Sequence, residues 1–170
     1  ENLINEFGMP KSLENEINKA CQNISAPNTV KLVNGTCMQV KHDHIGRIIS
    51  KTAYFYEHDL IAYVKRYLSP KRVVDVGTNI GNHALGFAGH PDYKVVCFEP
   101  DSGLAEVARS NLEMNSIDNE IYNHGLGEKE EELPFIFGSI ENTGVGKFDR
   151  NMGSSKKLPV KRMDDCISEE

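Results

Sequence analysis

The sequence has no tryptophan and only four cysteines in 170 residues, and the cysteines form no CxxC pair. They stand far apart, as Cys21, Cys37, Cys97 and Cys166. Without closely spaced pairs, the sequence lacks the pattern of a zinc site or of a dense disulfide framework. We therefore expect reduced thiols in a cytoplasmic protein with no bound metal.

Long apolar runs and an excess of positive charge are also missing. No apolar stretch approaches the ~20 residues of a membrane-spanning helix, and the first residues, ENLINEFGMPKSLENE, lack the basic head and apolar stretch of a secretory signal. The formal net charge of −6 disfavours a nucleic-acid backbone as the main partner. We expect neither a membrane nor a nucleic acid as partner, and a length sufficient for one hydrophobic core.

The most informative stretch is RVVDVGTNIGNHAL, residues 72–85. Its first part, Arg72–Val76, is a short β-branched run bounded by turn residues, which is typical of a strand. Gly77 and Gly81 then frame a loop, and a helix is expected to begin by Ala84. The stretch thus predicts a strand, a tight glycine turn and a helix.

A second strand, KVVCF at Lys94–Phe98, ends beside Glu99. A helix between these strands and another after Glu99 predict βαβ crossovers and parallel strands. The acid at the end of the second strand, about 20 residues beyond the glycine loop, is placed to accept hydrogen bonds from ribose hydroxyls. Together these features indicate a cofactor that carries a nucleoside.

Apolar periodicity and turn residues predict the remaining elements. Before the central strand we expect a helix over 12–24, a β-hairpin over 29–40 with a type I′ turn at Asn34-Gly35, an ambiguous segment over 45–55 that is partly strand, and a helix over 60–68. After Glu99 we expect a helix from an Asp101 N-cap to about Asn115, strands over 120–124, 133–137 and 158–163, an edge position for Pro134, and a mobile loop over 139–157.

These elements predict an α/β protein with a Rossmann-like, doubly wound sheet, preceded by an N-terminal helix and β-hairpin. We expect residues 1–53 to form an extension packed on a core of residues 54–170. Only three parallel strands can be placed, fewer than such a sheet normally has, so we expect the sheet to be truncated at the C-terminus and the chain to be part of a longer protein.

The glycine spacing distinguishes two classes of cofactor. A dinucleotide site uses G-x-G-x-x-G, which brings the backbone close to a pyrophosphate. Here the spacing is G-x-x-x-G, and Asn79 stands at the position of the middle glycine. S-adenosylmethionine has no pyrophosphate, and Asp75, the loop of residues 77–81 and Glu99 offer polar groups for its amino acid and ribose parts.

Four segments then resemble the FkbM-type methyltransferase family: VVDVGTNIGNHAL, VVCFEPDSGLAEVARSNLEMN, IYNHGLGEKEEEL and LPVKRMDD. The family pattern is DVGANxG after a strand, FEP after the next, L-x-x-N-x-x-x-N in a helix, AlG after a third strand, and LDD. The match covers roughly positions 54–166 and departs mildly at Thr78, Gly125 and Met163. The family's following strand, which ends in an IDvEG segment, has no counterpart here.

The resemblance implies a methyltransferase sheet, S-adenosylmethionine as cofactor, and O-methylation of a hydroxyl on a small molecule or sugar. It implies that the cofactor is held by ten residues, Glu57, Asp75, Gly77, Thr78, Asn79, Gly81, Glu99, Pro100, Gly125 and Leu126. Gly77, Asn79 and Gly81 would wrap the methionine part and Glu99 the ribose. Gly125 and Leu126 would lie near the adenine.

Several alternatives stay open at this point. Asp75 is as well suited to bonding the loop amides as the cofactor, and Glu57 is equally explained as a first-turn acid of a helix. The sequence His42-Asp43-His44 is read as a solvated loop rather than as a metal site. His83, His124 and Glu57 are candidate bases, and none is assigned as catalytic. A nicotinamide-dependent oxidoreductase and a non-catalytic cofactor-binding module are the competing functions.

Overall fold

The computed structural model describes residues 28–68, 71–90, 92–118, 120–153 and 156–167. Its elements are β1 (Thr29–Lys31), β2 (Cys37–Gln39), α2 (His44–Thr52), α3 (His58–Tyr67), β3 (Arg72–Val76), α4 (Asn82–Ala88), β4 (Lys94–Phe98), α5 (Ser102–Met114), β5 (Glu120–Tyr122), β6 (Gly125–Leu126), β7 (Glu131–Ile136), β8 (Lys147–Phe148) and β9 (Lys157–Lys161), with 3-10 turns η1 (Thr143–Val145) and η2 (Met163–Asp165). The helix expected over 12–24 lies outside the described residues.

The central sheet has the strand order β3-β4-β5, and both pairs are parallel. β3 and β4 have the bounds predicted from their β-branched runs, and Arg72 pairs with Lys94 at the start of the ladder. The α/β class and the parallel strands are therefore confirmed. The strand order runs without a reversal in the described residues, so the doubly wound topology stays a prediction.

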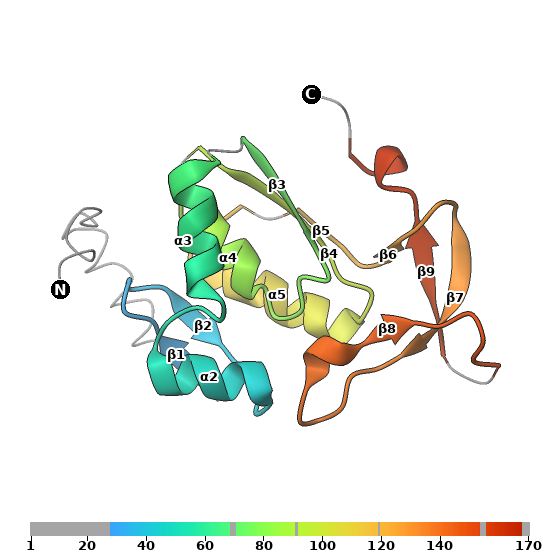
Figure 1. Cartoon of the computed structure of the whole chain (residues 1–170), viewed down its shortest axis with the longest axis horizontal. Helices are drawn as coiled ribbons and strands as arrows, with labels where there is room; N and C mark the ends of the chain where they lie inside the picture. Colours follow the sequence, from blue (N-terminus) through green and yellow to red (C-terminus); the bar gives the residue numbers. More distant parts are fainter. Residues whose placement is uncertain (1–27, 69–70, 91, 119, 154–155, 168–170) are drawn as a thin grey trace.

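Helices α4 and α5 cover this sheet, and α3 packs on the outer side of α4 (Figure 1). Cys97 of β4, Leu85 of α4 and Leu112 of α5 belong to one buried apolar cluster. Burying one such leucine contributes about 2 kcal/mol. A Cβ at Gly86 of α4 would lie 2.5 Å from Cδ1 of Ile61, so α3 and α4 approach closely because residue 86 is a glycine.

The N-terminal hairpin forms as predicted, but its turn differs. β1 and β2 are antiparallel, and the N–H of Gly35 donates to the carbonyl of Leu32 over 2.9 Å. Gly35 has φ +91°, whereas Asn34 is not among the residues with positive φ. A type I′ turn needs positive φ at both central residues, so that prediction is wrong. Gly35 instead comes directly after the two central residues of the turn, and its positive φ directs the chain toward β2.

Cys37, at the start of β2, is disulfide-bonded, whereas Cys97 and Cys166 are free. The expectation of uniformly reduced cysteines is therefore wrong at Cys37. Because disulfide bonds persist mainly in oxidising compartments, the cysteine pattern no longer supports a cytoplasmic location.

Two asparagines of α5 bind the hairpin to the core. Asn111 accepts from the N–H of Gln39 (2.6 Å) and donates to its carbonyl (3.0 Å), and Asn115 makes the same pair with Cys37 (2.9 and 2.6 Å). The spacings match, because four helix residues advance about 6 Å and two strand residues about 6.6 Å. Asn111 also donates to the carbonyl of Ile80 (2.8 Å). The helix thereby holds both the hairpin and the glycine loop.

The segment expected to be partly strand, residues 45–55, is largely helix α2. Asp43 begins this helix by accepting the N–H of Gly46 through Oδ1 over 2.8 Å. The reading of residues 42–44 as a solvated loop is therefore wrong for Asp43, which is 1% exposed. The adjacent β-branched Ile48 and Ile49 favour a strand in isolation, and the cap and the core contact of Ile49 override that preference.

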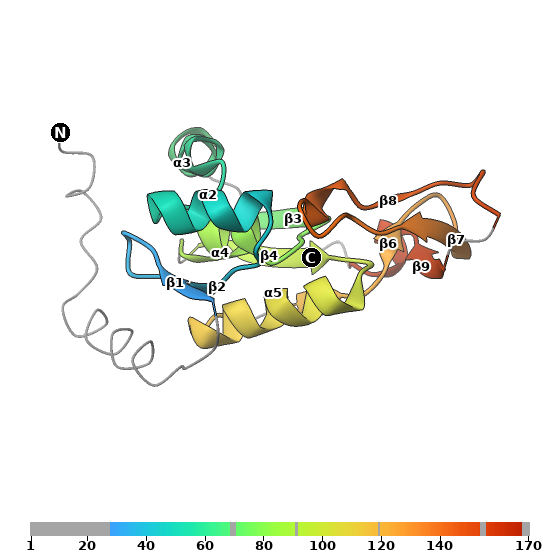
Figure 2. The ribbon, with the colours of Figure 1, turned by 90° about the horizontal axis from the view of Figure 1, so that it is seen from below.

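A second sheet, in the order β6-β9-β7-β8, lies beyond the carboxyl ends of the parallel strands (Figure 2). β7 is an inner strand, so the edge position predicted from Pro134 is wrong. The N–H of Phe135 donates to Lys156 on the β9 side. The backbone nitrogen of Pro134 therefore points to the β8 side. The pairing of β7 with β8 begins only at Phe135, so no backbone N–H is needed at position 134. The expected mobile loop over 139–157 instead contains η1 and β8.

Candidate functional site

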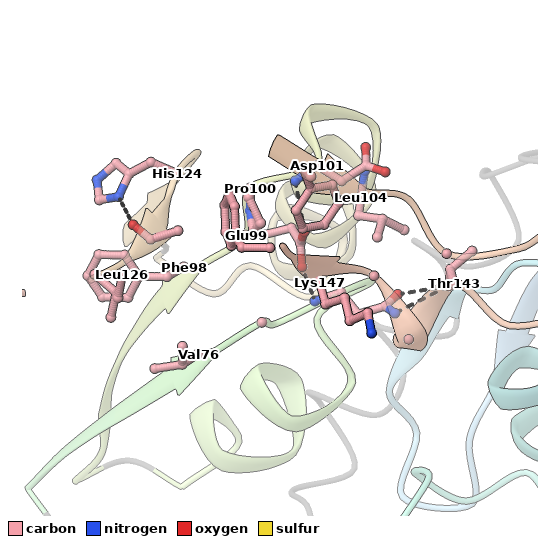
Figure 3. A pocket seen from close by; sticks show the side chains of 18 residues that line it. Val76, Phe98, Glu99, Pro100, Asp101, Leu104, His124, Leu126, Thr143 and Lys147 are labelled. Carbon is pink, nitrogen blue, oxygen red and sulfur yellow. Dashed lines mark hydrogen bonds between the residues drawn. The ribbon is translucent and has the colours of Figure 1, made fainter. Parts of the chain in front are cut away.

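A cavity of about 230 Å³ lies where the two sheets meet, at the carboxyl edge of β3 and β4 (Figure 3). This is the edge at which open α/β sheets bind their ligands. The first sheet contributes the chain just after β3 and β4. The second sheet contributes β6 and the segment from Phe135 to Phe148, which we call the arm.

Six of the ten residues predicted to hold a cofactor line this cavity. They are Gly77, Asn79, Glu99, Pro100, Gly125 and Leu126. Glu57, Asp75, Thr78 and Gly81 do not belong to the lining. The structure therefore brings together the glycine loop, the acid after β4 and the start of β6, as the motif order predicts.

Glu99 is buried, with 4% of its surface exposed, and both of its carboxylate oxygens are fixed by backbone donors. Oε2 accepts the N–H of Asn79 and Oε1 accepts the N–H of Asp101, each over 2.9 Å. Each oxygen keeps a second lone pair for a further donor. Burial raises the pKa of this carboxyl above its ordinary value, and the two N–H donors offset part of that rise.

The glycine loop presents open space to the cavity at Gly77. Gly77 has φ +77°, and a Cβ built there would have no atom within 4 Å. A side chain would therefore project into free space rather than into the protein. Gly81, with φ +81°, serves packing instead, because a Cβ there would lie 3.3 Å from the backbone of Ala108 in α5.

Asp75 and Thr78 bond each other behind this loop. The hydroxyl of Thr78 donates to Oδ2 of Asp75 over 2.7 Å. Asp75 also pairs in register with Cys97 of β4, and burial raises the pKa of that thiol to about 12, so the thiol stays protonated and unreactive. In this structure Asp75 thus bonds a loop side chain, which is neither of the two roles weighed from sequence, and it does not belong to the cavity lining.

Glu57 and His83, two candidate bases, are brought together away from the cavity lining. Nε2 of His83 lies 3.2 Å from Oε2 of Glu57. Glu57 precedes α3 with φ +55° and its side chain does not cap the helix, so the interpretation as a helix-start acid does not account for its conformation. The pair lies at the start of α4, next to the glycine loop.

His124, the third candidate base, lines the apolar end of the cavity beside Phe98 and Leu126 (Figure 3). Its Nδ1 lies 2.9 Å from the carbonyl of Gly125. Because a carbonyl only accepts, we assign the proton to Nδ1, which leaves a lone pair on Nε2. Nε2 lies 3.6 Å from Sγ of Cys166, and burial raises the pKa of that thiol.

The arm is the part of the site that sequence reasoning missed. Phe135, Thr143, Lys147 and Phe148 all line the cavity. The glycine-rich composition of residues 138–146 is typical of a loop, and it gave no sign that contacts with distant residues fix this segment as a wall of the cavity. The apolar run at residues 133–137 is the signal that could have indicated it.

Phe148 also explains why residue 125 is glycine rather than alanine. A Cβ at Gly125 would lie 2.3 Å from Cε2 of Phe148. We expect Gly125→Ala to lower the free energy of unfolding by about 1–3 kcal/mol through overpacking. Urea denaturation measures this, with Gly153→Ala as control because nothing lies within 4 Å of its Cβ position. The loss should shrink in a Phe148→Ala background, and strictly additive losses would contradict this contact.

Within the described residues, no helix is both long and apolar enough to cross a bilayer, and no cluster of three or more His, Cys, Asp or Glu is arranged to hold a metal ion. No protein-family model and no curated protein matches the chain.

Proposed function

We propose that this chain is an S-adenosylmethionine-dependent methyltransferase of the FkbM type, with a Rossmann-like sheet, that methylates a hydroxyl on a small molecule or sugar. The observation that carries the proposal is the position of Glu99. Its carboxylate lies on the cavity wall at the carboxyl end of β4, is oriented by the N–H groups of Asn79 and Asp101, and keeps lone pairs for two ribose hydroxyls.

The other cavity residues fit the same cofactor. Phe98, Pro100 and Leu126 offer apolar surface for an adenine ring, and the open face at Gly77 leaves room for the methionine part. The cavity, about 230 Å³, is smaller than the roughly 300–1,000 Å³ of most ligand pockets. We therefore expect it to enclose the nucleoside part, with the methionine part extending along the glycine loop.

The residues of this chain would contribute positioning and exclusion of water, which are the main requirements of methyl transfer. Bound S-adenosylmethionine supplies an electrophilic methyl group on a positively charged sulfur. Glu99 would hold the ribose, and the apolar side chains of Phe98, Pro100 and Leu126 would keep water from the adenine ring. The Glu57–His83 pair lies outside the lining, so we assign it no catalytic role.

A dinucleotide fits this loop less well. The middle glycine of a dinucleotide motif lets the backbone approach the pyrophosphate, and here Asn79 occupies that position with its amide directed to Thr143 (3.2 Å). The Asn79 side chain thus occupies space beside the loop that a middle glycine would leave open. This geometry favours S-adenosylmethionine over NADH.

Calorimetric titration of the 170-residue chain tests the proposal. We expect saturable micromolar binding of S-adenosylmethionine and of S-adenosylhomocysteine, and none of NADH at the same concentration. Binding of NADH alone would favour the oxidoreductase. Absence of binding for all three ligands would overturn the proposal for this chain.

A further inference from the structure

Three segments that are far apart in the sequence meet at the side of the cavity. They are the start of α2 at Asp43, the glycine loop at Asn79, and the arm at Thr143; of these residues, Figure 3 labels Thr143. Asp43 is a buried carboxylate, 1% exposed, and the proposed chemistry gives it no task. A buried charge is costly unless its oxygens are bonded, so its partners are informative.

The oxygens of Asp43 have different partners. Oδ1 accepts the N–H of Gly46 within the helix cap. Oδ2 accepts the hydroxyl of Thr143 over 2.5 Å and faces its N–H at 3.4 Å. The arm is further tied to this helix by the N–H of His44, which donates to the carbonyl of Glu141 over 2.7 Å. Asp43 therefore anchors an arm residue 100 positions away.

Thr143 also hydrogen-bonds to Asn79 of the glycine loop, so it links this loop to Asp43. Its hydroxyl has one proton, which it donates to Asp43, and its lone pairs accept from Nδ2 of Asn79 over 3.2 Å. Asn79 has φ +53°, in the left-handed region that asparagine adopts more readily than most residues with a side chain. The backbone N–H of Asn79 in turn donates to Glu99.

We infer that Thr143 is a positioning residue, which uses the buried carboxylate of Asp43 to hold Asn79 in the conformation that orients Glu99 for a nucleoside ligand. The inference rests on the proposed function for the identity of the ligand. Thr143 itself acts through Asn79, and its role is to pre-organise the acceptor that the ribose requires.

A double-mutant cycle tests this inference. Thr143→Val keeps the shape and removes the hydroxyl, Thr143→Ser keeps the hydroxyl, and Asn79→Gly removes the amide while glycine accepts positive φ. We expect Thr143→Val to weaken S-adenosylhomocysteine binding about tenfold, the cost of one hydrogen bond in a charged network. Thr143→Ser should bind like the wild type. Thr52→Val, at an exposed threonine on α2, is the control.

The cycle separates positioning from general destabilisation. If Thr143 acts through Asn79, Thr143→Val costs little further affinity in an Asn79→Gly background. Additive losses, or a Thr143→Ser variant as weak as Thr143→Val, would overturn the inference while leaving the proposed function intact. If the wild type binds no ligand, the proposed function fails, and the same cycle is read from urea unfolding midpoints. Coupling between positions 79 and 143 is expected there too, and its absence refutes the inference.

Discussion

Asn111→Leu is expected to lower the free energy of unfolding by about 3–5 kcal/mol, one of the larger losses that a single substitution produces. Asn111 is fully buried, and the change leaves the N–H and carbonyl of Gln39 and the carbonyl of Ile80 without their side-chain partner. Leucine has a similar shape and no polar atom, so the lost hydrogen bonds rather than a cavity account for the effect.

Urea denaturation followed by circular dichroism measures this loss. The matched control is Glu113→Leu, two positions along the same helix at an exposed site, where the change should stay within about 0.5 kcal/mol. Since a domain of this size is stable by only about 5–15 kcal/mol, Asn111→Leu removes a large share of the total. A loss below 1 kcal/mol would show that these hydrogen bonds are replaced by water.

The same residue shows what sequence alone could predict about the fold. Its spacing from Asn115 resembles the N-x-x-x-N spacing of the FkbM-type pattern. The sequence does not predict, however, that the two side-chain amides hydrogen-bond to the backbone of β2 in the way that a neighbouring strand would. The bounds of β3 and β4 were predictable because β-branched runs between turn residues are local signals. The helical state of residues 44–52 depends on a cap and a core contact, and so on long-range structure.

The candidate site likewise contains residues that could be predicted from sequence and one that could not. Gly77 and Glu99 line the cavity because each directly follows a strand at the carboxyl edge of the parallel sheet, and such strand ends can be predicted from sequence. Leu126 lines it as the last residue of β6. Thr143 was not predictable, because its place is set by Asp43, 100 positions earlier. A composition rich in Gly and Asn indicates a loop, but it carries no information on which distant side chain fixes that loop.

Glu99→Gln is expected to weaken S-adenosylhomocysteine binding at pH 7 by about tenfold to a hundredfold, because a hydrogen bond to a charged acceptor is worth roughly 1.5–3 kcal/mol. Glutamine retains one acceptor oxygen and turns a donor toward the N–H of either Asn79 or Asp101. Both the ribose contact and the orientation of the side chain suffer. Glu106→Gln, at an exposed acid on α5, is the control and should bind like the wild type.

The pH dependence of stability identifies the same carboxylate without any ligand. Burial raises the folded-state pKa of Glu99 above the ordinary value of 4.5, so the folded protein holds this proton more tightly than the unfolded chain. The contribution of Glu99 to the free energy of unfolding is therefore fully present below pH 4.5 and is lost as the pH rises through the folded-state pKa. Glu99→Gln removes that fall, so the stability of the variant relative to the wild type should improve from pH 4 to pH 7. If the two stability curves run parallel over that interval while binding is unchanged, Glu99 is neither a strained buried carboxylate nor the ribose acceptor, and the assignment of the cavity loses its central residue.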